Sequence, residues 1–166
     1  MPIRPHTLPQ RPPVPGFTLV ELMVVVAVLG ILAVFAVPSM AAMINNGRLQ
    51  SSSGELVAVM QLARSEAVRR NSRMVACAAT SGTTCVATAS RLVVYWQDPA
   101  NAATRELVRE VALPTSVQVT GPATGVEFRS SGLIDDPEEL TVTNSAGTRC
   151  VTVMISGVVN EKNGAC

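Results

Sequence analysis

The sequence contains one histidine, His6, and Phe, Trp and Tyr together make up only 3% of its 166 residues. Nucleophile systems of the Ser/His/Asp and Cys/His types need a histidine beside the nucleophile, so the chain has little material for such catalysis. The sequence also has no glycine-rich phosphate loop and no zinc-protease motif. A single Trp and a single Tyr give few surfaces on which nucleic acid bases can stack. The composition therefore disfavours an enzyme and a binder of single-stranded nucleic acid.

Charged residues are almost missing from one long segment. The run from Phe17 to Val37 is apolar apart from Glu21, and at about 1.5 Å per residue it is long enough to cross a hydrocarbon core of roughly 30 Å. Arg4 and Arg11 precede this run and no acidic residue does, which places the amino terminus in the cytoplasm and the remaining chain outside it. Pro38 follows the run and predicts a break in the helix, because proline removes a backbone hydrogen bond.

Glu21 is the exception in this run. A carboxylate at the bilayer centre costs roughly 2.5 to 3.5 kcal/mol, so we expect Glu21 to have a function. Its surroundings, Gly16-Phe17-Thr18-Leu19-Val20-Glu21-Leu22, resemble the class III signal of type IV pilins and type II secretion pseudopilins. This resemblance implies that a prepilin peptidase cuts between Gly16 and Phe17 and methylates the new amino terminus of Phe17. It also implies that Glu21 pairs with the amino group of a neighbouring filament subunit, since either charge buried alone carries a large desolvation cost. An ordinary signal anchor with a stray acid is the alternative.

Cleavage at this place would change the composition of the chain. It would remove His6, Arg4 and Arg11, which leaves no histidine and 11 basic against 12 acidic residues. A mature chain of that kind has no histidine base and no broad positive charge for phosphates.

Helical spacing continues after the apolar run. Apolar residues recur there at intervals of three and four, at Met40, Met43, Ile44, Leu56, Val57, Met60, Ala63, Ala67 and Val68. The polar stretch 45–54, which holds two glycines, is either a weak or bent part of the same helix or a break in it. Arg69, Arg70 and Arg73 lie near the expected helix end, where cations are favourable, and Asn71 is the expected C-cap. We therefore predict one helix from the start of the apolar run to about Arg70.

After residue 73 the chain is rich in valine and in turn-forming residues. Short segments separated by Gly, Pro, Asn, Asp or Ser are the expected strands, at 74–78, 92–96, 107–112, 117–120, 126–129, 140–143 and 150–156. Their alternation predicts an antiparallel sheet with one covered face, and the second half of the helix supplies the cover. The predicted fold class is α+β: a long amino-terminal helix, transmembrane in its first half, packed on an antiparallel β-sheet domain. The pilin resemblance implies the same architecture, the pilin-like roll.

The patterns and the resemblance divide the chain into four parts. A cleaved leader occupies 1–16, a transmembrane and filament-core helix 17–38, the continuation of that helix 39–72, and an antiparallel β domain 73–166. A domain of that length buries one modest core, so a single globular unit is expected after the helix.

The four cysteines are Cys77, Cys85, Cys150 and Cys166, and none forms a CxxC pair. In a small domain outside the cytoplasm, disulfides are the natural interpretation, and four cysteines allow three connectivities. We favour the two local pairings, Cys77 with Cys85 and Cys150 with Cys166, because the first pair flanks a hairpin-like loop and the second brackets the last strand and its tail. Metal binding is the alternative, but the spacing does not match a zinc site.

A second resemblance concerns the role within the pilin-like proteins. The segment Leu62-Ala63-Arg64-Ser65-Glu66-Ala67-Val68-Arg69-Arg70-Asn71, with the segments around Tyr95-Trp96 and Phe128-Arg129-Ser130-Ser131-Gly132, resembles the minor pilin family that contains FimU, FimT and the H-type pseudopilin GspH. It implies a FimU-like structural subunit that primes pilus assembly and stays at or near the filament tip. The alternatives are a GspH-type pseudopilin of a type II secretion system, a FimT-like pilin that binds DNA in natural transformation, and a membrane-anchored secreted enzyme.

DNA binding would need a basic surface. Arg64, Arg69, Arg70 and Arg73 form a candidate weak patch, to which Arg91 can add. DNA-binding FimT members carry a Gly-Arg-x-Arg-like tail after the last strand, whereas the corresponding Ser156-Gly157-Val158-Val159-Asn160 has no arginine. DNA is therefore not the expected partner.

Acidic residues gather at Asp135, Asp136, Glu138 and Glu139, and we interpret them as a charged turn. Calcium is the alternative ligand, held by that run or by Asp98 with Asn101, although neither cluster matches a known calcium loop. No cofactor is expected.

The expected partners are other minor and major pilins or pseudopilins, the prepilin peptidase and the assembly platform of the inner membrane. The expected location is the bacterial inner membrane, with one membrane pass and the carboxy-terminal domain in the periplasm, and then the pilus or pseudopilus.

Overall fold

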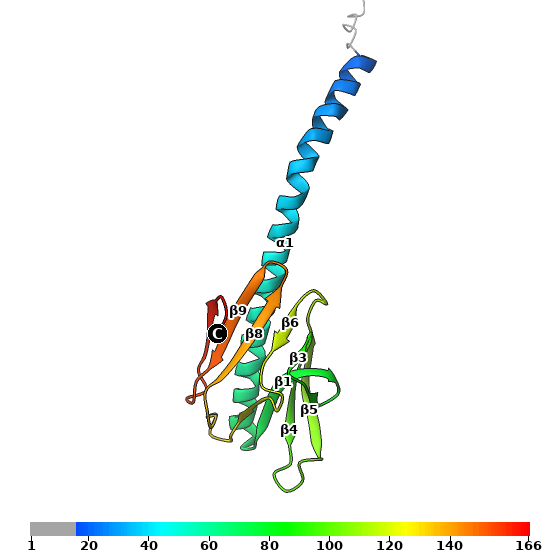
Figure 1. Cartoon of the computed structure of the whole chain (residues 1–166). Helices are drawn as coiled ribbons and strands as arrows, with labels where there is room; N and C mark the ends of the chain where they lie inside the picture. Colours follow the sequence, from blue (N-terminus) through cyan, green and yellow to red (C-terminus); the bar gives the residue numbers. More distant parts are fainter. Residues whose placement is uncertain (1–15) are drawn as a thin grey trace, which may run out of the picture. The chain divides into compact units, whose positions relative to one another are not determined.

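The computed structural model describes residues 16–166, apart from the side chains of residues 35–38. These residues form an α+β fold in which one helix, α1 (Leu19–Arg70), precedes ten β-strands (Figure 1). The chain divides into two compact units, one ending at Ser39 and one comprising Met40–Cys166, and α1 supplies residues to both. The α+β class predicted from the sequence is confirmed.

The first part of α1 exposes its apolar side chains. Every side chain described from Gly16 to Val34 is exposed, and most of these residues are Leu, Val, Ile or Met. Among the described residues, no single helix is both long and apolar enough to cross a membrane. The two segments of α1 on either side of residues 35–38, Leu19–Val34 and Ser39–Arg70, meet these two requirements when they are taken together. Pro38 lies in the stretch 35–38, outside the described side chains, so the predicted helix break there stays a prediction.

The second part of α1 packs against the strands. The polar stretch 45–54 is helical throughout, and within it Leu49, Ser52 and Ser53 are buried. The apolar stripe continues through residues that are less than 4% exposed, Leu56, Val59, Met60, Ala63 and Ala67. A break in this stretch, which the sequence left open, does not occur.

The helix ends as its sequence predicts. The helical pattern stops at Arg70, and Asn71 follows with a φ of 47°. The Ser72 N–H donates to the Ala67 carbonyl oxygen at 3.1 Å, and the Asn71 N–H donates to the Val68 carbonyl oxygen at 3.2 Å. These two bonds form a Schellman motif, for which asparagine is a suitable left-handed residue.

The strands form two antiparallel sheets rather than the single sheet that the sequence predicted. The first sheet has the order β2-β1-β4-β5, and β7 pairs with β1. Its strands are β1 (Met74–Ser81), β2 (Thr84–Cys85), β4 (Arg91–Gln97), β5 (Arg105–Ala112) and β7 (Val126–Phe128). The second sheet has the order β10-β9-β8-β6-β3. Its strands are β3 (Thr88–Ala89), β6 (Gln118–Thr120), β8 (Glu138–Asn144), β9 (Gly147–Val153) and β10 (Val159–Asn163).

One apolar core joins α1 to both sheets. Leu56 and Met60 of the helix belong to the same buried cluster as Val94 of the first sheet and Leu140 and Val151 of the second. A smaller cluster lies on the other face of the first sheet, and its members are Val75, Cys77, Ala79, Val93 and Tyr95. The predicted single core is therefore accompanied by a second small one.

Two details of the predicted elements differ in the structure: the exposure of four helix residues and the end of the last predicted strand. Met40, Met43, Ile44 and Val68, which the spacing placed on one apolar stripe with the buried residues of the helix, are all exposed. The last predicted strand, 150–156, ends at Val153 because a tight turn follows, in which the Met154 N–H donates to the Val158 carbonyl oxygen at 2.9 Å.

Candidate functional site

The amino-terminal segment places three of the predicted functional residues within six positions. Gly16, Phe17 and Thr18 precede the helix and are not helical. The Glu21 N–H donates to Thr18 Oγ1 and the Leu22 N–H donates to the Thr18 carbonyl oxygen, each at 3.2 Å. Thr18 is thus the N-cap of α1, and Glu21 occupies the third position of its first turn.

This N-cap was not predicted, although its signal is present in the sequence. Thr18-x-x-Glu21 is the spacing of a capping box, in which the acid three residues after a threonine also favours the positive end of the helix. Glu21 therefore suits the first turn of its helix, and it is exposed.

The arginines of the candidate DNA patch lie at the end of α1 and just after it. Glu66 accepts hydrogen bonds from Arg69 Nε at 2.9 Å and from Arg70 Nε at 2.9 Å, and these bonds hold the pKa of its carboxyl at about 2. Arg70 also bonds Glu106 at 3.2 Å, and Arg73 pairs with Glu127 at 2.8 Å. Three of the four arginines therefore share their charge with carboxylates of the same domain.

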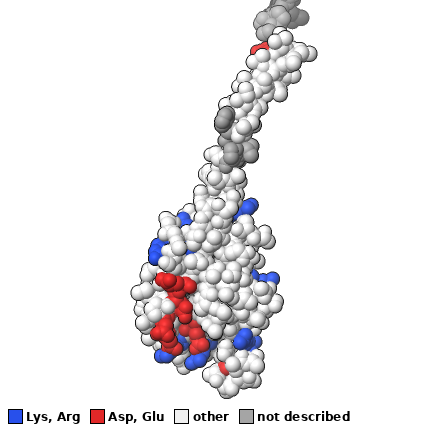
Figure 2. All heavy atoms as spheres, viewed as in Figure 1, with Lys and Arg blue, Asp and Glu red and all other residues white. Residues whose placement is uncertain are grey.

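Arg91, the additional candidate, pairs with Glu110 at 2.9 Å. Figure 2 shows acidic atoms gathered in one area of the domain and basic atoms scattered around it. A continuous positive surface of the kind that phosphates need is not present on this face. The basic residues of the patch are thus brought near one another, but mostly in ion pairs.

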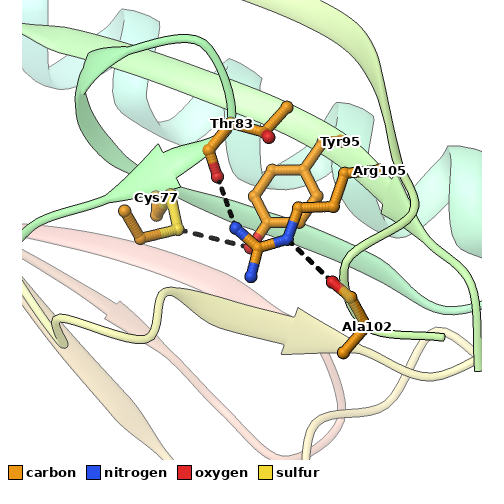
Figure 3. Close-up of a disulfide and its surroundings, with 6 residues drawn as sticks. Cys77, Thr83, Tyr95, Ala102 and Arg105 are labelled. Carbon is orange, nitrogen blue, oxygen red and sulfur yellow. Dashed lines mark hydrogen bonds between the residues drawn. A yellow bond between two sulfur atoms is a disulfide. The ribbon is translucent and has the colours of Figure 1, made fainter.

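The Cys77–Cys85 disulfide joins β1 to β2 across eight positions of sequence. Tyr95 Oη lies 3.4 Å from Cys85 Sγ, and the Arg105 guanidinium lies 5.1 Å from the centre of the Tyr95 ring, a cation–π contact (Figure 3). Arg105 donates to the Thr83 carbonyl oxygen at 2.9 Å and to the Ala102 carbonyl oxygen at 3.1 Å. The disulfide loop, the ring and the arginine therefore support one another over the small second core.

Burial raises the pKa of Tyr95, so its hydroxyl stays protonated at neutral pH. Gly125 lies against the same cluster with a φ of 83°, and a Cβ there would be 2.8 Å from Cys77 Cβ. Glycine is needed at this position because a side chain would collide with Cys77 and because other residues rarely adopt this positive φ.

The Cys150–Cys166 disulfide holds the carboxy-terminal residue to β9. Nearby, Glu161 of β10 accepts a hydrogen bond from the buried Ser53 hydroxyl of α1 at 2.6 Å and pairs with Arg149 at 2.5 Å. The Ser53 bond is the main reason why the pKa of Glu161 is lowered, with Arg149 acting in the same direction. We call the Ser53–Glu161 hydrogen bond a latch, because it joins α1 to β10. The sequence did not suggest it, since the two residues are far apart in the chain.

A groove lies between α1 and the turn that joins β9 to β10. It has a volume of about 560 Å³ and is lined by Gln61, Arg64, Ser65, Val68, Arg69, Gly157, Val158 and Val159. Val158 and Val159 belong to the segment in which the sequence lacks the arginines of DNA-binding FimT members. The β9–β10 turn thus contributes valines to the groove, and its two arginines, Arg64 and Arg69, come from α1.

Three residues of the two candidate calcium clusters bond within the chain. Asp98 Oδ1 accepts the Ala100 N–H at 2.8 Å, and Asn101 Oδ1 accepts the Ala103 N–H at 3.1 Å. Asp135 pairs with Arg129. Among residues that the structure describes, no three His, Cys, Asp or Glu side chains are grouped to hold a metal ion.

The chain is similar to solved structures of a minor pilin and a minor pseudopilin. The chain is similar to the type IV minor pilin FimU of Pseudomonas aeruginosa, with 18% identity over 70% of this chain and 90% of that one, and a TM-score of 0.56. A second crystal form of FimU gives a TM-score of 0.53. The minor pseudopilin EpsH from the type 2 secretion system of Vibrio cholerae matches with 15% identity over 70% of this chain and 97% of that one, and a TM-score of 0.53. At these identities the likeness concerns the fold.

Comparison with family models adds the sequence evidence, whereas no curated protein sequence matches the chain. The prokaryotic N-terminal methylation motif matches residues 14–37, which include Gly16, Phe17 and Glu21. This motif marks an amino-terminal signal and anchor helix. The model of the type II transport protein GspH matches residues 52–158, from the middle of α1 to the turn after β9. The chain therefore belongs to the GspH family of pilin-like structural subunits, which are minor pilins and pseudopilins and not enzymes.

Proposed function

We propose that this chain is a FimU-like minor pilin of a type IV pilus. It is inserted in the bacterial inner membrane through residues 17–38, with its domain in the periplasm. A prepilin peptidase cuts after Gly16 and methylates Phe17, and the subunit then joins other minor and major pilins at the assembly platform. It primes assembly and stays at or near the filament tip.

The exposure of the amino-terminal helix is the observation that supports this proposal most. The described side chains from Phe17 to Val34 are exposed and most of them are apolar, and a soluble protein rarely leaves such a surface uncovered. Lipid covers it before assembly, and the helices of other subunits cover it afterwards. Glu21 lies three positions after the N-cap and is exposed, so the Phe17 amine of a neighbouring subunit can approach its carboxylate.

The second candidate is the H-type pseudopilin of a type II secretion system. The description of the matching family and the likeness to EpsH favour it. DNA uptake is a weaker candidate, because Arg69, Arg70 and Arg73 are in ion pairs with carboxylates. A gel shift with the domain tests it: a salt-sensitive shift at micromolar protein would support a DNA receptor.

Deletion of the gene separates the first two candidates when pili and secretion are measured in the same strain. We expect fewer sheared pili, unchanged release of type II substrates, and recovery on complementation. Loss of secretion with normal piliation would instead assign the chain to the pseudopilus. Neighbouring genes give an independent answer, since minor pilin genes favour the pilus, and secretin and secretion ATPase genes favour secretion.

A further inference from the structure

Five exposed apolar side chains lie on the segments that form or adjoin the groove between α1 and the β9–β10 turn, and two of them, Val68 and Val158, line it. They come from α1, from the turn that follows β7 and from the turn between β9 and β10, namely Val68, Leu133, Met154, Ile155 and Val158. Their exposed fractions run from 41% for Leu133 to 53% for Val68. A single exposed apolar residue is ordinary, whereas a contiguous group around a hollow marks a binding surface.

The contacts within the domain hold these segments together. The Ile134 N–H donates to the Ile155 carbonyl oxygen at 3.1 Å, which joins the two turns. A Cβ at Gly157, whose φ is 74°, would lie 2.7 Å from Arg64 Nε, so glycine lets the turn approach the helix. The groove is therefore preformed, and a partner that binds there has little ordering cost.

The charges at the groove have one sign. Arg64 and Arg69 are the charged side chains that line it; Arg69 is paired with Glu66, whereas Arg64 forms no ion pair with any residue that the structure describes. An apolar floor with an arginine rim is complementary to an aliphatic side chain flanked by carboxylates.

A second copy of the chain is poorly suited to supply that surface. Two exposed leucines outside α1 stand near acids. Glu106, next to Leu107, is already paired with Arg70, and of the acids near Leu133, Asp135 is paired with Arg129 whereas Asp136 has no ion pair among the described residues. Leu133 is also part of the groove patch itself.

We propose that this groove is the docking site for the globular domain of a different pilin-like subunit, which inserts an aliphatic side chain flanked by carboxylates. The inference rests on the proposed function in one respect, since it assumes a subunit that assembles with other pilins. It adds the place of contact and the chemistry of the partner.

Site-specific photocrosslinking in the full-length chain tests this proposal. A photoreactive amino acid replaces Val158, and the chain is co-expressed in turn with each pilin-like protein encoded beside its gene. Leu107, which is 44% exposed against 45% for Val158, is the matched control position on β5. We expect an adduct with one of these subunits from position 158 and none from position 107.

Two variants on separate elements guard against local misfolding. Val68→Asp on α1 and Arg64→Glu on the rim should each lower the adduct yield about tenfold, the effect of losing a central interface contact, whereas Leu107→Asp should leave it unchanged. Both disulfides should still form in every variant.

Several results would overturn the inference. These are an adduct mainly with a second copy, an adduct with DNA that nuclease removes, an adduct only with proteins that are not pilin-like, or no adduct from position 158. If filaments contain the chain but position 158 gives no adduct, the groove proposal fails and the pilin function stands. If the chain never enters filaments while the adduct forms, the proposed function fails and the groove proposal stands.

Discussion

The two units of this chain differ in whether their apolar side chains are exposed or buried. From Leu19 to Val34 the helix exposes nearly every apolar side chain, whereas from Leu49 onward α1 buries one face against two sheets. The domain also has two disulfides and seven ion pairs within the described residues. The difference teaches that stability and assembly are divided along the chain, because the domain contains its own core and the amino-terminal segment must find its burial elsewhere.

This division can be broken most completely at Gly16. A bulky residue there, as in Gly16→Trp, should block processing altogether, because the side chain would occupy the position next to the bond that is cut. Gel mobility of the membrane fraction measures this, and the precursor should accumulate with a folded domain. Gly30→Leu is the control, since a side chain at Gly30 meets open space within the chain. Normal processing of Gly16→Trp would refute the assigned cut.

Glu21 is the next strongest test of the division. Glu21→Ala should leave membrane insertion and processing intact but lower incorporation into sheared filaments at least about tenfold, because the amine of the neighbouring subunit would lose its partner. Quantitative blotting of sheared filaments against the membrane fraction measures this. Glu55→Ala, a carboxylate in the second part of the same helix, is the control. Equal incorporation of Glu21→Ala and the wild type would exclude the charge pair.

The features nearest to local sequence rules could be predicted. The helix, its end at Asn71 and the valine-rich strands follow from spacing and turn residues, which act over a few positions. The division into two sheets could not, because it depends on pairings between distant segments, such as Val119 with Val142. Strands of two residues, β2 and β3, have no period to detect.

The candidate site shows the same limit. Gly16, Phe17 and Glu21 lie within six positions of one motif, so the sequence alone singles them out and their roles stay predictions. The two cysteine pairings were favoured because each closes a short loop. The groove needs residues near positions 64, 133 and 158, and nothing in the sequence links them before folding. Ile155 was assigned to a strand by alternation, but a turn at Gly157, with positive φ, interrupts that pattern.

The disulfides test the second unit of the comparison, the domain with its own core. Replacing both Cys150 and Cys166 by serine should lower the free energy of unfolding of the domain by about 3 kcal/mol, because a loop near 15 residues is released in the unfolded chain. Cys77 and Cys85 are separated by only eight positions, so replacing both by serine releases a shorter loop. The free energy of unfolding should therefore fall by somewhat less in this variant. Urea unfolding of both variants gives the two values. Processing of the full chain should be unaffected, and a processing defect would mean that the units are not independent.

The Ser53–Glu161 latch should give a smaller effect that depends on pH. Ser53→Ala should lower stability at neutral pH by about 1.5 kcal/mol, the low end for a hydrogen bond to a charged group. Because the pKa of Glu161 is lowered in the folded state, the contribution is present above the unfolded pKa and is lost as pH falls through the folded one. Ser51→Ala, an exposed serine of the same helix, is the control. A pH-independent difference between Ser53→Ala and the wild type would argue against the charged bond.

Glu66 should give the smallest effect on stability and the clearest one on titration. Hydrogen bonds from Arg69 and Arg70 lower the pKa of its carboxyl to about 2. The stability that these ion pairs contribute is therefore fully present at pH values above the ordinary pKa of a glutamate, and it is lost as the pH falls through about 2. Arg69→Gln removes the first of these bonds and should return the pKa part of the way toward its ordinary value, which NMR titration of the carboxyl carbon measures. Arg91→Gln, which breaks a pair elsewhere on the domain, should leave the Glu66 titration unchanged. If the wild-type carboxyl titrates near its ordinary value, the arginines at the end of α1 are free to bind phosphates, and the case against DNA weakens.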